Sequence, residues 1–183
     1  MQTVYATNMP VARAGLVADS GLVQDTISRL AEDAAGAKAG TFVVPGTDAE
    51  RQAVVPTTAA EITDGDGLGV VMYDASKEPG KTAAALAAGN EYDVEEMLPV
   101  MQKARVWVLC DAAATIVANT PAFVRYDTAS TPAGILGAFR EDVDTADAAA
   151  LPGAFFRSAH RDVDFDGAGM QRIALVEINL PTA

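Results

Sequence analysis

A chain of 183 residues, half of them hydrophobic, suits one domain plus an extra segment and excludes a mainly disordered protein. Its formal net charge of −12 disfavours a role in binding DNA, RNA or anionic membranes, because such binding requires a positively charged surface. The sequence contains neither an apolar run long enough for a membrane helix nor a signal peptide, so we expect the protein to work in the cytoplasm where it is made, or in a particle that leaves it.

The first forty residues predict an N-terminal arm. Residues 1–15 have no steady hydrophobic period and contain Pro10, which is typical of an extended segment. Val23, Ile27 and Leu30 have the spacing of a two-turn amphipathic helix, which is too short to be stable unless it docks on another surface. A strand is the weaker interpretation of the same residues.

Residues 41–183 predict a β body. Short apolar segments alternate with turn residues, and no βαβ alternation is present, so the pattern favours an all-β sandwich or barrel. Pro99 indicates that its segment is an edge strand or a bent one. The expected strands cover residues 41–44, 52–55, 69–73, 97–101, 105–110, 121–126, 137–139, 154–157 and 172–180.

Three stretches do not fit strands. Residues 82–88 are rich in alanine and predict a helical turn or a surface loop, residues 141–150 an exposed acidic loop, and residues 158–169 a polar loop. Cys110 is the single cysteine, which excludes an intrachain disulfide, and its apolar neighbours predict a buried side chain. Trp107 is expected in the core, and Tyr126 in the core or at an interface.

Two motifs suggest ligands but are incomplete. Gly80-Lys81-Thr82 lacks the earlier glycine of a phosphate-binding loop, since Ala75 occupies that position, so a turn is the better interpretation. Asp162, Asp164 and Asp166 match the first half of a calcium loop, but Ile173 stands where the closing glutamate belongs. We therefore expect no cofactor and no dedicated metal site, and whether the three aspartates hold a hydrated cation stays open.

Catalytic machinery is scarce in the sequence. His160 is the single histidine, so any nucleophile–base arrangement would need it, and no Gly-x-Ser-x-Gly motif is present. His160 is predicted to be an ordinary surface residue, and the protein is predicted not to be an enzyme.

Taken in order, the β segments resemble the structural cement proteins that accompany the major capsid proteins of tailed phages. The stretch from Gly40 to Asp48 carries this resemblance together with the leader from Pro10 to Asp19. The other matching stretches are residues 62–71, 91–92, 97–101, 104–108, 121–126, 137–139, 151–159 and 174–181. The resemblance implies a jelly-roll or β-barrel body, without catalytic residues, that stabilises a capsid by clamping neighbouring capsomers as a homo-dimer or homo-trimer.

The predicted function is that of a cement protein on the outer surface of a virion, with the major capsid protein as its partner. A carbohydrate- or host-binding β module and a small hydrolase are the alternatives. The contact residues are predicted in the arm, because it carries apolar side chains without a clear core of its own. These candidate interface residues are Tyr5, Pro10, Val11, Leu16, Val17 and Leu22.

Overall fold

The computed structural model describes residues 12–18, 24–32, 37–65, 67–77, 90–129, 134–164 and 170–180. Within these ranges the regular secondary structure is almost entirely β strand, which confirms the predicted all-β class. The helices are α1 (Ala59–Thr63), η1 (Ala75–Lys77) and η2 (Asp144–Ala146). The strands are β1 (Asp25–Ala31), β2 (Ala37–Lys38), β3 (Phe42–Pro45), β4 (Gln52–Val54), β5 (Gly69–Val71), β6 (Glu91–Tyr92), β7 (Met97–Cys110), β8 (Pro121–Arg125), β9 (Phe139–Arg140), β10 (Ala148–Phe156), β11 (Arg161–Asp164) and β12 (Met170–Asn179). None of the described helices is long and apolar enough to cross a bilayer.

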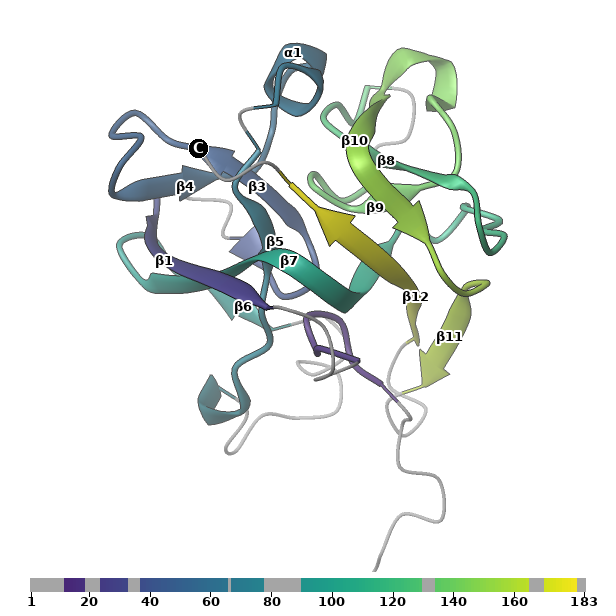
Figure 1. The fold of residues 1–183 in the computed structure, drawn as a ribbon, viewed down its shortest axis with the longest axis horizontal. Coiled ribbons are helices and arrows are strands. Elements are labelled where there is room, and N and C mark those ends of the chain that lie inside the picture. Colours follow the sequence, from purple (N-terminus) through teal and green to yellow (C-terminus); the bar gives the residue numbers. More distant parts are fainter. Residues whose placement is uncertain are drawn as a thin grey trace, which may run out of the picture.

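The long strand β7 is shared by two closed rings of strands. Its first half pairs with β1 and β5, and these are joined through β4 and β3. Its second half pairs with β12 and β9, and these are joined through β10 and β8. Figure 1 shows the two groups on either side of β7. Strand β11 adds to the edge of β12, and β2 and β6 form a small separate sheet.

Strands β3 and β5 are buried on both faces. Val43 and Val71 face the core of the first ring, whereas Phe42 and Val70 belong to the larger core cluster that fills the second. Phe42 meets Phe139 edge-to-face with ring centroids 6.5 Å apart. A strand that is covered on both faces needs apolar side chains at consecutive positions, so apolar and polar residues do not alternate along it.

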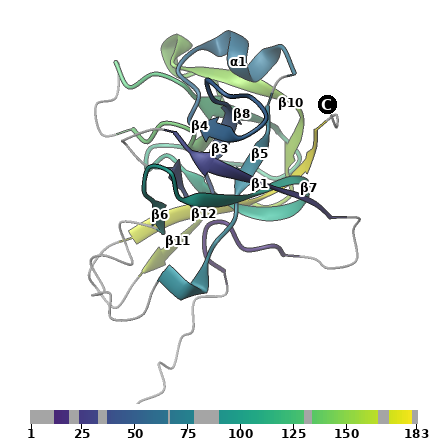
Figure 2. The same cartoon turned by 90° about the vertical axis from the view of Figure 1, so that its left-hand side faces the viewer.

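Helix α1 covers one end of the body. Thr58 caps it through its side chain, Glu61 returns a bond to the cap, and Ile62 is fully buried in the core. Figure 2 shows α1 at the end of the molecule where β8 and β10 lie, and α1 contacts β10.

The helix predicted from Val23, Ile27 and Leu30 is wrong. Residues Asp25–Ala31 form β1, which pairs antiparallel with β7, with Ile27 opposite Val100, and parallel with β4. These two ladders satisfy backbone groups that a two-turn helix would leave open at its ends, so tertiary pairing outweighs the helical spacing. The predicted boundary at residue 40 stays a prediction.

Other segments also differ from expectation. Residues 97–101 and 105–110 belong to one strand, and Pro99 lies in its interior between β1 and β5, not at an edge. The carbonyl of Pro99 still accepts a hydrogen bond from the Met72 N–H at 2.8 Å. Arg161–Asp164, expected in a polar loop, forms the edge strand β11. Residues 82–88 and the Gly80-Lys81-Thr82 motif lie outside the described residues.

Candidate functional site

The candidate site begins with residues 12–18, here called the docking segment, which lie along the second half of β7. The Gly15 N–H donates to the Trp107 carbonyl at 2.6 Å, and the Trp107 N–H donates to the Leu16 carbonyl at 2.9 Å. The Ala18 N–H donates to the Arg105 carbonyl at 2.8 Å. The docking segment is therefore held by a short ladder of main-chain hydrogen bonds, like an added strand.

Gly15 has a conformation that only glycine adopts easily. Its φ is +83°, and a Cβ atom at this position would lie 2.5 Å from the Tyr73 nitrogen. The Tyr73 N–H also donates to the Gly15 carbonyl at 3.1 Å. This close approach joins the docking segment to the chain that follows β5.

Small apolar side chains complete the attachment. Ala12 and Ala14 are buried against Leu109 and Ile173, so they form a third, separate core cluster on the outer face of β7 and β12. Trp107, Ile135 and Val163 pack around this cluster as partly buried residues. Trp107 is therefore half-buried beneath the docking segment and is not part of the main core.

The candidate interface residues now divide into two groups. Leu16 is exposed, at 36% of its surface, whereas Val17 is half-buried, bridges to Val106 and packs against the main core. Tyr5, Pro10, Val11 and Leu22 lie outside the described residues. Of the two that are described, Leu16 is the one that faces outward.

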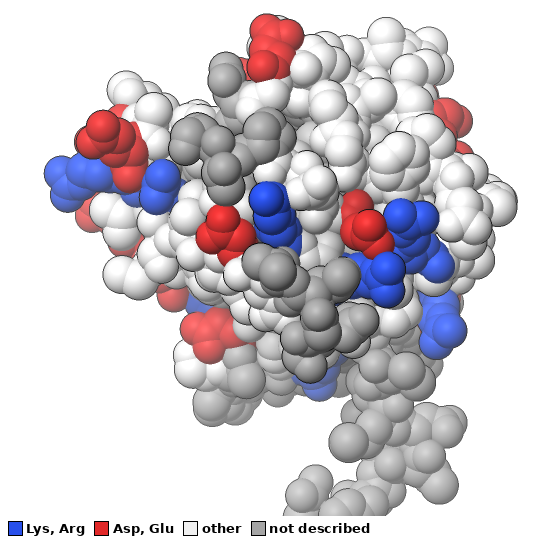
Figure 3. Space-filling view, viewed as in Figure 1, with Lys and Arg blue, Asp and Glu red and all other residues white. Residues whose placement is uncertain are grey.

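Charged side chains lie on the same face of β7 as Trp107. Glu177 accepts from Arg105 at 2.8 Å and from Arg157 at 3.2 Å. Hydrogen bonds from Arg157 and Arg105 lower the pKa of Glu177, so this carboxylate stays ionised in mild acid. Arg161 lies over the Trp107 ring, 5.7 Å from its centroid. Figure 3 shows several basic side chains directly beside acidic ones in this view of the molecule.

In the calcium-like motif, the first aspartate is bonded to an arginine. Asp162 lies on β11 and receives two hydrogen bonds from Arg172 on β12, at 2.8 and 3.1 Å. These bonds lower the pKa of Asp162, and they occupy both of its carboxylate oxygens. Asp166 lies outside the described residues. Among the described His, Cys, Asp and Glu side chains, no group is arranged to hold a metal ion.

His160 and Cys110 have structural surroundings. The Nδ1 atom of His160 accepts a hydrogen bond from the Ile116 N–H at 3.1 Å, which helps hold the loop between β7 and β8. Cys110 is buried as expected, and burial raises the pKa of its thiol well above the ordinary value. Neither geometry matches a nucleophile with an adjacent base.

A buried ionic network supports the loop before β10. The fully buried Arg125 donates from Nε to Asp111 Oδ2 at 2.5 Å and also pairs with Asp144. Arg140 donates to the same Asp111 oxygen at 3.1 Å and contacts Asp144 at 3.3 Å. Burial opposes the charge on Arg125, but its hydrogen bonds to Asp111 and Asp144 outweigh that effect and raise its pKa.

This network corrects the prediction of an exposed acidic loop over residues 141–150. Asp142 is exposed, but Asp144 points inward to both arginines, and residues from Ala148 onward belong to β10. Asp144, Thr145 and Ala146 all have positive φ angles, of 41°, 60° and 77°. Such conformations cost energy in residues other than glycine, and the Asp144 ion pairs hold the loop in them.

The sequence and the fold of the chain both resemble those of known phage proteins. Residues 1–179 match the model of the family described as structural cement protein (E217 gp24/Pam3 gp6). A chain in the solved capsid of Myoviridae phage XM1 has the same fold, with a TM-score of 0.66 and 16% identity over 98% of this chain and 97% of that one. No curated protein matches the sequence.

The family match over residues 1–179 shows that the chain is a structural protein of a phage virion. Within that class it belongs to the structural cement protein family. The predicted cement function is thereby confirmed, and neither the glycan-binding nor the hydrolase alternative is favoured.

Proposed function

We propose that the protein binds the outer surface of a phage capsid through its N-terminal segment and joins neighbouring copies of the major capsid protein. It does so without catalysis, as a rigid β body that carries an extended contact segment. Many such contacts repeated over a shell add to a large total stabilisation even where each one is weak.

The attachment of the docking segment to β7 is the observation that carries this proposal. Main-chain hydrogen bonds to Trp107 and Arg105 fix residues 12–18 on the body, so the residues on either side leave from a defined place. Those flanking residues include four of the apolar interface candidates: Tyr5, Pro10, Val11 and Leu22. A contact segment that extends from a folded body can cover a large partner surface with few residues.

The net charge of the chain favours binding to the outer surface of the capsid over binding to its inner surface. A net charge of −12 would be repelled by packaged DNA, which is itself densely negative. On the face that carries the docking segment, Arg161 over Trp107 and the Arg105–Glu177–Arg157 group offer side chains that suit a polar protein interface.

Deleting residues 1–11 tests the role of the segment. We expect this variant to lose binding to capsids that lack their cement protein, measured by co-sedimentation, because the apolar contacts at Tyr5, Pro10 and Val11 are removed. Its thermal unfolding should stay close to that of the full chain, since residues 12–18 and β1 remain. A deletion of residues 1–40 is unsuitable, because it removes β1 from the first ring.

A matched control replaces Val143 by Ser. Val143 is an exposed apolar residue in the loop before η2, and its loss should leave co-sedimentation unchanged. Normal co-sedimentation of the protein without residues 1–11 would contradict the proposed contact segment.

A further inference from the structure

Side chains from other elements hold the middle of the loop that joins β7 to β8. The Nη1 group of Arg172 donates to the Ala114 carbonyl at 2.8 Å, and the Thr115 N–H donates to Glu141 Oε1 at 2.7 Å. Residues 112–120 contain no ionisable side chain of their own. The position of this part of the loop therefore depends on groups that approach it from β12 and from the chain after β9.

A third contact of the same kind involves the single histidine of the chain. The Ile116 N–H donates to Nδ1 of His160 at 3.1 Å, and the side chain of Ile116 is buried in the main core. A ring nitrogen that accepts a hydrogen bond carries no proton, so this bond requires the neutral ring with its proton on Nε2. The loop is thus held here by the neutral form of a residue that can take up a proton.

The connection from β10 to β11 holds the His160 ring against the loop. The Leu175 N–H on β12 donates to Ser158 Oγ at 3.0 Å, and the Arg157 N–H donates to the Leu175 carbonyl at 2.7 Å. His160 itself is half-buried. Because the backbone just before the ring is tied to β12, a proton on Nδ1 would place two N–H donors against each other and remove the bond to Ile116.

Charged groups of both signs surround His160 in the described part of the fold. Glu141 follows β9, Asp162 lies on β11 and interacts with the ring, and Arg172 on β12 pairs with Asp162 at 2.8 Å. Arg161 follows His160 directly in the chain. Since the acidic and the basic groups are equal in number, neither sign of charge dominates around the ring.

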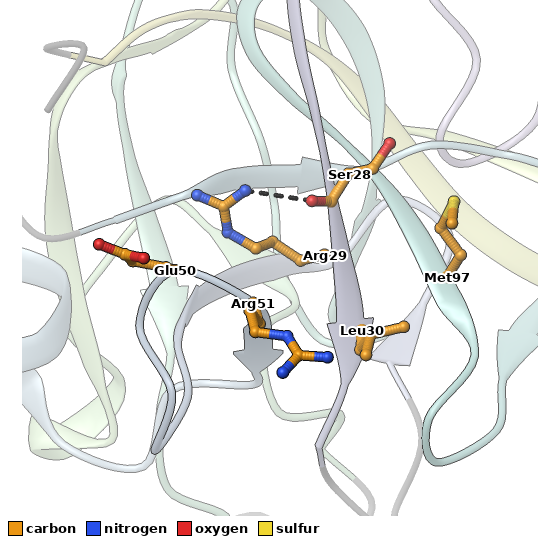
Figure 4. A pocket seen from close by; sticks show the side chains of 6 residues that line it. All are labelled: Ser28, Arg29, Leu30, Glu50, Arg51 and Met97. Carbon is orange, nitrogen blue, oxygen red and sulfur yellow. Dashed lines mark hydrogen bonds between the residues drawn. The ribbon is translucent and has the colours of Figure 1, made fainter.

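No histidine lines the shallow hollow of about 200 Å³ where β1, the turn before β4 and the start of β7 meet. Figure 4 shows its lining, which consists of Ser28, Arg29, Leu30, Glu50, Arg51 and Met97. Histidine is the one ordinary side chain whose charge changes between about pH 5 and pH 8. A response to mild acid is therefore sought at His160 and not at this hollow.

We infer that His160 is a pH-sensitive latch for the loop between β7 and β8. At neutral pH and above, its neutral ring accepts from the Ile116 N–H and the loop is closed. In mild acid the ring takes up a proton at Nδ1 and the bond is lost. The loop then opens and exposes Ile116 beside Val117, which is already 58% exposed. This latch does not depend on the proposed capsid binding.

Proton linkage sets the direction and the size of the effect. The open loop leaves Nδ1 free to bind a proton, whereas the closed loop does not, so lowering the pH favours the open form. A freely exposed histidine takes up its proton near about pH 6.5. The closed loop therefore keeps its full stability at about pH 8, and opening becomes about 30-fold more frequent at about pH 5.

Hydrogen exchange at the Ile116 amide, corrected for the intrinsic pH dependence of exchange, measures this opening in the full chain. In the wild type, the protection factor of this amide should fall about 30-fold between about pH 8 and about pH 5. The Leu109 amide on β7 donates to the Gly40 carbonyl at 2.9 Å and is the internal control. Its protection should stay constant, which excludes global unfolding.

Two variants separate the loss of the acceptor from the uptake of the proton. His160→Asn places an amide oxygen near the position of Nδ1 but cannot titrate, so Ile116 should stay protected at both pH values. His160→Phe removes the acceptor, so protection should be low at both. Wild-type protection that is the same at the two pH values, or an equal fall in His160→Asn, would overturn the inference.

Discussion

Replacing Arg125 by Met is expected to lower the free energy of unfolding by about 3–5 kcal/mol, the cost of removing one partner from a buried ion pair. Arg125 is fully buried, and its removal would leave Arg140 as the one remaining cation beside the Asp111 and Asp144 carboxylates. The loop at Asp144 to Ala146 would also lose one of the two ion pairs that hold its positive φ angles. Chemical denaturation at neutral pH measures the effect.

Arg157→Met provides the matched control for this prediction. Arg157 pairs with Glu177 at 3.2 Å, but both side chains are about one-third exposed. Exposed pairs contribute less than about 1 kcal/mol, so this variant should stay close to the wild type. An equal decrease in the free energy of unfolding in the two variants would mean that the Arg125 network stabilises the fold no more than a surface ion pair does.

Replacing Gly15 by Val should release the docking segment from β7. The new side chain would need a φ of +83° and a Cβ position 2.5 Å from the Tyr73 nitrogen. A left-handed conformation alone costs about 1–2 kcal/mol, and a β-branched side chain in so narrow a space adds to it. If the substitution destabilises the docked state of the segment by about 2 kcal/mol, its local opening becomes about 30-fold more frequent.

Hydrogen exchange at the Trp107 amide reports this opening, because that N–H donates to the Leu16 carbonyl. We expect faster exchange there and at Tyr73, together with weaker capsid binding. Ala18→Val is the control, since Ala18 lies in the same segment and is exposed. Unchanged protection of Trp107 in the Gly15 variant would show that the docking segment does not depend on this close approach.

The sequence predicted the β class and most strand positions because apolar runs bounded by turn residues report burial directly. The runs over β3 and β5 are continuous since both faces of these strands are covered. The sequence could not predict β1, because the spacing of Val23, Ile27 and Leu30 also fits a helix. Only the ladders with β7 and β4 decide between the two.

The buried network was missed for a related reason. Closely spaced acidic residues suggest a solvated loop, yet Asp144 points inward to Arg125 and Arg140, which lie on β8 and β9. A signal was present, since each arginine ends a short apolar strand where a charge is otherwise unexpected. No such signal predicted the docking of residues 12–18. Alanine and glycine allow close packing against many kinds of surface, so their role becomes clear only once the strand they pack against is known.

The central claim is that an N-terminal segment fixed to a β body attaches this protein to the outside of a phage shell. A cryo-electron microscopy reconstruction of cement-free capsids mixed with the full chain tests it most directly. The account predicts added density on the outer surface, with the β body standing on a strip of density contributed by residues before Asp25. A reconstruction without added density, or with the body bound inside the shell, would contradict it.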